Sequence, residues 1–70
     1  RDLPFYTVLI PLYREASVVP NLVRAISALN YPREKLDVKL ILEPDDTDTI
    51  AAVQAIQLDP CFEIIHAPLL

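Results

Sequence analysis

Two clusters of residues could bind a small polar ligand, and each cluster follows an apolar stretch of the sequence. They are Pro11-Leu12-Tyr13-Arg14-Glu15 after the first stretch, and Glu43-Pro44-Asp45-Asp46 after the second. Ionised carboxylates accept hydrogen bonds from hydroxyl and N–H groups, such as those of a ribose or a nucleobase. An aromatic ring beside them adds a flat apolar surface. The residue types therefore predict recognition of a nucleoside.

Three short apolar stretches provide the strands that would position these groups. Residues 6–12 and 38–42 are almost continuously apolar, which is typical of strands inside a parallel sheet. Residues 62–66 form a third strand before Pro68. Pro11 is expected at the end of its strand, where a missing N–H group is tolerated.

Two helices are expected between the strands. Apolar residues recur at helical spacing in the first, at Val19, Leu22, Val23, Ile26 and Leu29. Ser17 is the expected N-cap of this helix, and Pro20 lies in its first turn, where proline costs little. The second helix is expected over residues 49–57, with Thr47 or Asp48 as its N-cap.

The elements alternate as strand, helix, strand, helix and strand, which predicts an α/β fold with a parallel sheet. Right-handed crossovers favour a three-layer, Rossmann-like βαβαβ unit with the strands in the order 3-2-1. We expect residues 1–70 to form one incomplete domain, a segment of a longer chain. Ligands bind beyond the carboxyl ends of parallel strands, near the point where strand order reverses. Both residue groups fall at such ends, so the segment is expected to supply half of a binding site.

Composition excludes several classes of site. The chain has no glycine, which both the Walker loop and the dinucleotide fingerprint require. One His and one Cys cannot build a His/Cys zinc cluster, and a single Cys excludes an internal disulfide, which favours a cytosolic or cytosol-facing segment. Six basic and ten acidic side chains give a net charge of −4, which argues against nucleic acid as the main partner. The apolar stretches are far shorter than the roughly 20 residues of a membrane span.

The same residues also have a purely structural interpretation. Asp45, Asp46 and Asp48 lie where a helix starts, and helix starts favour acids as caps and through the helix dipole. Under this interpretation Tyr13 is a packed loop aromatic and Glu15 is a solvated acid. The alternative to a ligand site is therefore a non-catalytic α/β interaction fragment whose acidic residues are only helix caps.

The order of these motifs resembles a known family. The run Tyr-Thr-Val-Leu-Ile-Pro-Leu-Tyr-Arg-Glu over residues 6–15 is followed by a helix and then by Leu-Ile-Leu-Glu-Pro-Asp-Asp over residues 40–46. This resembles the opening of family 2 glycosyltransferases, which read as apolar strand, Pro-x-Tyr/Phe-Asn-Glu, helix, apolar strand and Asp-Asp-Gly-Ser. The link Tyr-Pro-Arg-Glu-Lys-Leu over residues 31–36 looks closest to the cellulose-synthase-like branch. The resemblance covers nearly the whole chain.

The resemblance implies the start of a GT-A domain. The full enzyme would bind a nucleotide sugar, with a UDP sugar expected, and transfer the sugar to a growing glycan. By this resemblance Pro11, Leu12 and Tyr13 border the nucleobase. Glu15 lies near the ribose and the base, and Asp45 contacts the uracil or the ribose. Asp46 is the weaker match, near the same pocket.

Two places depart from the family pattern. Arg14 stands where the pattern has Asn, and Thr47 and Asp48 stand where it has Gly and Ser. In the family a metal-binding Asp-x-Asp motif and an acid/base carboxylate come later in the chain. The resemblance therefore assigns no catalytic and no metal-binding residue to this segment. A divalent cation, Mg or Mn, is expected for the full domain only, and the segment alone is expected to be inactive.

The resemblance also implies partners and a location. The partners are a UDP-sugar donor and a glycan acceptor, and the location is the cytoplasm or the cytoplasmic face of a membrane. Cellulose-synthase-like relatives often carry membrane helices, so membrane association would run through regions outside this segment. The exposed edge of an incomplete sheet predicts association of the segment with other strands.

Overall fold

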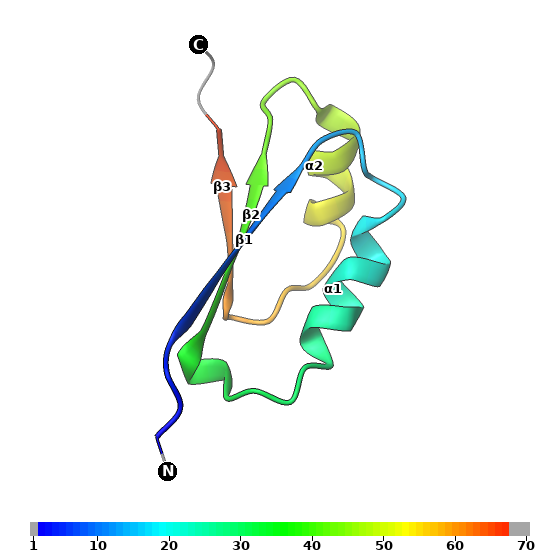
Figure 1. Cartoon of the computed structure of the whole chain (residues 1–70). Helices are drawn as coiled ribbons and strands as arrows, with labels where there is room; N and C mark the ends of the chain where they lie inside the picture. The colour runs from blue at the N-terminus through cyan, green and yellow to red at the C-terminus, as the bar shows by residue number, and fades with distance from the viewer. Residues whose placement is uncertain (1, 68–70) are drawn as a thin grey trace.

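Three parallel strands form one sheet in the order β1-β2-β3, as the sequence predicted. The computed structural model describes residues 2–67 (Figure 1). The elements in chain order are β1 (Tyr6–Leu12), α1 (Val19–Ser27), the 3₁₀ turn η1 (Arg33–Lys35), β2 (Leu36–Leu42), α2 (Thr47–Gln54) and β3 (Phe62–His66). The small α/β domain with a parallel sheet is therefore confirmed.

Both helices cover the same face of the sheet, so the described residues build two layers (Figure 1). The three-layer arrangement expected from the sequence is wrong for this part of the chain. The strand order advances from β1 to β3 without reversing. Successive right-handed crossovers in one direction place their helices on one side of the sheet. The opposite face of the sheet is left open over residues 2–67.

The core lies between the helices and the central strand. Alternate residues of β2 point toward the helices, and all four are buried: Leu36, Val38, Leu40 and Leu42. Val19 and Val23 of α1 and Val53 of α2 pack against this row. Burying each such side chain stabilises the fold by about 1.5–3 kcal/mol relative to leaving it in water. The apolar residues recur at helical spacing in α1 and α2 because both helices pack against the same core.

The open face of the sheet carries charges at its centre. Lys39 Nζ lies 3.1 Å from an Asp37 carboxylate oxygen and 2.5 Å from a Glu63 carboxylate oxygen. Glu63 first, and then Asp37, raises the pKa of the Lys39 ammonium. Asp37 and Lys39 belong to β2, and Glu63 is the β3 residue paired with Lys39. At the centre of the open face, the side chains of Asp37, Lys39 and Glu63 form ion pairs. The face beneath the helices is held by apolar contacts instead.

The helix starts differ from the expected ones. The N-cap of α1 is Val18, and Ser17 makes no cap hydrogen bond because backbone carbonyls of Glu15 and Ala16 satisfy the first N–H groups. Helix α2 begins two residues earlier than expected and ends at Gln54. Its N-cap is Asp46. None of the helices within residues 2–67 is long and apolar enough to cross a membrane.

Candidate ligand-binding site

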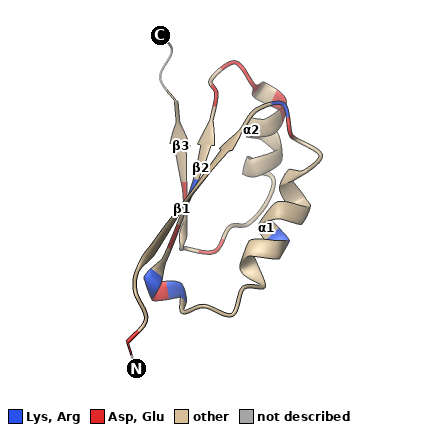
Figure 2. Cartoon of the chain, viewed as in Figure 1, with Lys and Arg blue, Asp and Glu red and all other residues tan. Residues whose placement is uncertain are grey.

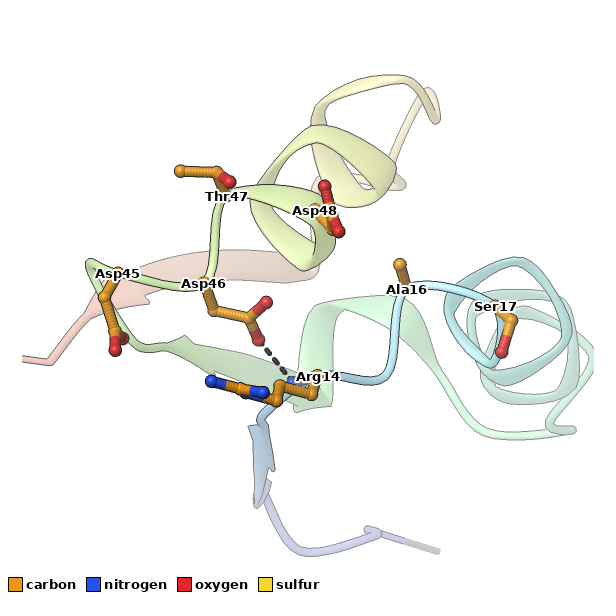
Figure 3. A pocket seen from close by; sticks show the side chains of 7 residues that line it. All are labelled: Arg14, Ala16, Ser17, Asp45, Asp46, Thr47 and Asp48. Carbon is orange, nitrogen blue, oxygen red and sulfur yellow. Dashed lines mark hydrogen bonds between the residues drawn. The ribbon is translucent and has the colours of Figure 1, made fainter.

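Two loops meet at the carboxyl ends of β1 and β2 and enclose an open hollow of about 500 Å³. One loop follows β1 and leads into α1, and the other follows β2 and leads into α2 (Figure 3). The residues that line the hollow are Arg14, Ala16, Ser17, Asp45, Asp46, Thr47 and Asp48. In Figure 2 the charged residues of both loops gather at this end of the sheet. The sequence placed the candidate site at this edge, and this hollow lies there.

The Asp46 side chain ties the two loops together. Its Oδ2 accepts a hydrogen bond from the Arg14 backbone N–H at 2.5 Å, and its Oδ1 accepts one from the Thr49 N–H at 3.4 Å. The residue is only 6% exposed. The Arg14 N–H is the main cause that lowers the pKa of the Asp46 carboxyl, and Thr49 adds to the same effect. Both carboxylate oxygens are therefore committed to the fold.

Thr49 provides a second tie between the same loops. Its Oγ1 accepts a hydrogen bond from the Glu15 backbone N–H at 3.1 Å. The side chain is fully buried at 0% exposure, so water cannot replace this bond. Together with Asp46, Thr49 fixes two consecutive backbone N–H groups of the loop after β1 to the first turn of α2. The shape of that loop is therefore set before any ligand binds.

Arg14 is held in a conformation that most residues avoid. Its φ is 54°, and no other described residue has positive φ. The left-handed region costs roughly 1–2 kcal/mol for residues with a Cβ, and Asn and Asp are the non-glycine residues that enter it most readily. The bond from the Arg14 N–H to Asp46 helps to hold this backbone in place. We conclude that the loop needs this sharp turn and obtains it without glycine.

The Arg14 guanidinium lies in the hollow, below the two aspartates that follow β2 (Figure 3). Its Cζ is 5.3 Å from the centre of the Tyr13 ring. Tyr13 is the main cause that raises the pKa of the Arg14 side chain, and Asp45 and Asp46 contribute less. The hollow thus combines one cation with carboxylates.

Within the described residues, Asp45 and Asp48 are the two exposed acids of the hollow whose side chains make no hydrogen bond or ion pair. Asp45 follows β2 after Glu43 and Pro44, as predicted. Of the six residues proposed from the sequence, only Asp45 and Asp46 line the hollow.

The four residues proposed near the end of β1 lie around this hollow without lining it. Glu15 Oε1 accepts a hydrogen bond from the Tyr13 backbone N–H at 3.2 Å, and the Tyr13 side chain is 47% exposed. Leu12 is part of the core at 4% exposure, and Pro11 is exposed on the open face of the sheet. Leu12 therefore anchors the start of the loop in the core. The hydrogen bond from the Tyr13 N–H to the Glu15 side chain lies within the loop itself.

Sequence reasoning assigned no site role to Arg14 or Thr49. The family resemblance marks Arg14 as a departure from the pattern and gives it no role. The structural interpretation of the sequence already names Asp46 among the possible helix caps, and Asp46 is the N-cap of α2. The hydrogen bonds of Asp46 and Thr49 to the loop after β1 could not be predicted from any pattern in the sequence.

The aspartates do not form a metal site by themselves. Asp46 and Asp48 have the spacing Asp-x-Asp, yet both Asp46 oxygens already accept N–H groups. Within residues 2–67, no three His, Cys, Asp or Glu side chains are arranged to hold a metal ion. The residues present therefore do not fit a divalent cation, and we derive no chemical step through one.

No family model, curated protein or solved structure matches this chain. The resemblance to family 2 glycosyltransferases therefore rests on the order and spacing of the motifs in the sequence.

Proposed function

We propose that this chain is the nucleoside-binding part of a GT-A glycosyltransferase domain that uses a nucleotide sugar, with a UDP sugar expected. The observation that carries the proposal is the uncommitted Asp45 carboxylate in the hollow at the carboxyl ends of β1 and β2. In parallel α/β folds this edge is where ligands bind. A volume of about 500 Å³ lies within the usual range of small-molecule sites.

The left-handed backbone at Arg14 supports the resemblance independently of the acids. The family pattern has Asn at this position, and Asn is among the few residues that tolerate positive φ. Arg14 has φ 54° there. A site that requires this turn would explain why the family pattern has Asn at this position. In this chain, hydrogen bonds from the Arg14 N–H to Asp46 and from the Glu15 N–H to Thr49 hold the turn although the residue is Arg.

In this proposal each group at the site has one role. Asp45 accepts a hydrogen bond from a base N–H or a ribose hydroxyl. Asp46 and Thr49 hold the loop after β1 in shape, so that binding does not have to order it. No residue of this segment performs the transfer step.

Titration of the chain with UDP tests the proposal. We expect the amide NMR signals of Arg14, Ala16 and Thr47 to shift, and Asp45→Asn to weaken the affinity about tenfold, since hydrogen bonds to charged groups are worth roughly 1.5–3 kcal/mol. Glu34→Gln is the matched control, because Glu34 is an exposed acid on η1, outside the hollow. Equal affinities of Asp45→Asn and the unmodified chain would contradict the proposal.

One observation favours the alternative of a non-catalytic interaction fragment. Asp46 is the N-cap of α2. The alternative assigns the same capping role to all of the acids at this helix start. If UDP shifts no amide of the two loops at millimolar concentration, then Asp45 has no nucleoside to bind and the alternative is the better account.

A further inference from the structure

The Arg14 side chain is a cation of the hollow that forms no ion pair among the described residues. Arg14 is exposed and lines the hollow, and none of the ion pairs within residues 2–67 includes it. A guanidinium carries five N–H donors in one plane and no acceptor. Donors of this side chain are therefore available to a ligand in the hollow.

The loop after β1 fixes where this guanidinium lies. The Arg14 backbone has φ 54°, and its N–H donates to Asp46 Oδ2 at 2.5 Å. The guanidinium Cζ lies 5.3 Å from the centre of the Tyr13 ring. In Figure 3 the guanidinium and the Asp45 carboxylate point into the same part of the hollow. A single ligand there can contact a donor of Arg14 and an acceptor of Asp45 together.

The charges of the hollow favour a neutral group as the partner of Arg14. Three carboxylates line the hollow beside the one guanidinium, those of Asp45, Asp46 and Asp48. A diphosphate placed there would bring further negative charge next to these carboxylates, and like charges in contact are unfavourable. A carbonyl oxygen of a nucleobase is neutral and accepts a hydrogen bond from arginine.

Uracil presents the groups that Arg14 and Asp45 together require. Its ring carries one N–H between two carbonyl oxygens, so an acceptor stands directly beside the donor. Cytosine has an acceptor nitrogen at the place of this N–H and an amino group at the place of one carbonyl. With the ribose held in the same position, cytosine would oppose acceptor to acceptor at Asp45.

We propose that Arg14 donates a hydrogen bond to a uracil carbonyl oxygen beside the N–H bound by Asp45, and so selects uridine over cytidine nucleotides. This role rests on the proposed function, because it requires a nucleoside in the hollow, and adds the residue that distinguishes one base from another. The resemblance assigns no such role, since the family pattern has the shorter Asn at this position.

NMR titrations of the chain with UDP and with CDP test this role. Arg14→Asn removes the guanidinium, and because Asn tolerates positive φ, the backbone N–H can still bond to Asp46. We expect this variant to lower the preference for UDP over CDP about tenfold, mainly by weakening UDP binding. The control Arg24→Gln changes an exposed arginine of α1 outside the hollow and should leave both affinities unchanged.

The ratio of the two affinities separates base selection from damage to the loop, because a distorted loop would weaken UDP and CDP alike. An unchanged ratio in Arg14→Asn overturns the role of Arg14. The proposed function still stands in that case if UDP binds and Asp45→Asn weakens it. If UDP shifts no amide of the two loops, both proposals are overturned.

Titration with uridine and cytidine, which carry no phosphate, tests whether Arg14 contacts the base. We expect Arg14→Asn to lower the preference for uridine over cytidine by the same factor of about ten. A loss of affinity for UDP with no change for uridine would place Arg14 at the phosphates and would overturn the proposal.

Discussion

The hydroxyl of Thr49 is expected to contribute more to stability than its size indicates. Replacing Thr49 by Val keeps the shape of the side chain and removes the acceptor for the Glu15 N–H. In Thr49→Val the partly buried N–H group of Glu15 faces a methyl group in place of the hydroxyl oxygen. Leaving a buried donor unsatisfied costs about 1–3 kcal/mol.

That free energy converts into a measurable change of the unfolding temperature. In a domain of this size, 1 kcal/mol shifts the midpoint by roughly 4–8 °C, so a loss of about 2 kcal/mol lowers it by roughly 8–16 °C. Thermal unfolding followed by far-ultraviolet circular dichroism measures the shift. Amide hydrogen exchange of Glu15 gives a local readout, and exchange should be faster in Thr49→Val.

Two variants make the comparison specific. Thr47→Val makes the same chemical change in the same turn of α2, at an exposed position, and should cost less than about 0.5 kcal/mol. Thr49→Ser keeps the hydroxyl and should recover most of the loss. If the midpoint of Thr49→Val equals that of Thr47→Val, then the bond to the β1 loop does not stabilise the fold and the reasoning is refuted.

Two further predictions concern the neighbouring hydrogen bond, which the Arg14 N–H donates to Asp46. The Arg14 N–H is the main cause of the lowered pKa of the Asp46 carboxyl. The Asp46 carboxylate therefore stabilises the fold fully at a pH above the ordinary Asp pKa of about 3.9. This stabilisation is lost as the pH falls through the lowered pKa of the folded state. The difference in urea midpoint between the unmodified chain and Asp46→Asn should therefore be constant from neutral pH to about pH 5 and shrink below about pH 4; a difference that grows in acid would contradict this. Arg14→Asn should raise the thermal midpoint by about 4 °C, and Arg14→Val should lower it, because Asn tolerates positive φ and β-branched residues do not; identical midpoints for the three chains would show that the backbone at this position is unstrained.

The strands could be predicted because each is an apolar stretch of the right length, and their order follows from right-handed crossovers between neighbouring strands. The alternation of buried residues in β2, from Leu36 to Leu42, was less visible, since Ile41 on the opposite face is also apolar. The number of layers was predicted wrongly although the information was present. An unreversed strand order combined with right-handed crossovers already requires both helices on one face.

The site was predictable in place but not in detail. Its location follows from the general rule for the carboxyl ends of parallel strands. The role of Asp46 depends on the Arg14 N–H, which lies 32 residues away, and that of Thr49 depends on the Glu15 N–H, which lies 34 residues away. Such contacts arise only when the sheet brings the two loops together. Local spacing could suggest the cap, but it could not show that the acid was already occupied.

The ion pairs of Lys39 on the open face also bear on how β3 finds its place. Sliding β3 by one residue would turn Glu63 toward the apolar side chains beneath the helices and would expose Ile64 in its stead. The unpaired carboxylate would then be buried, which costs far more than the exposed pairs gain. Lys39 and Glu63 therefore select one alignment of the strands by penalising its neighbours, and a chain with both residues changed to Thr would be expected to fold with a less well-defined β3.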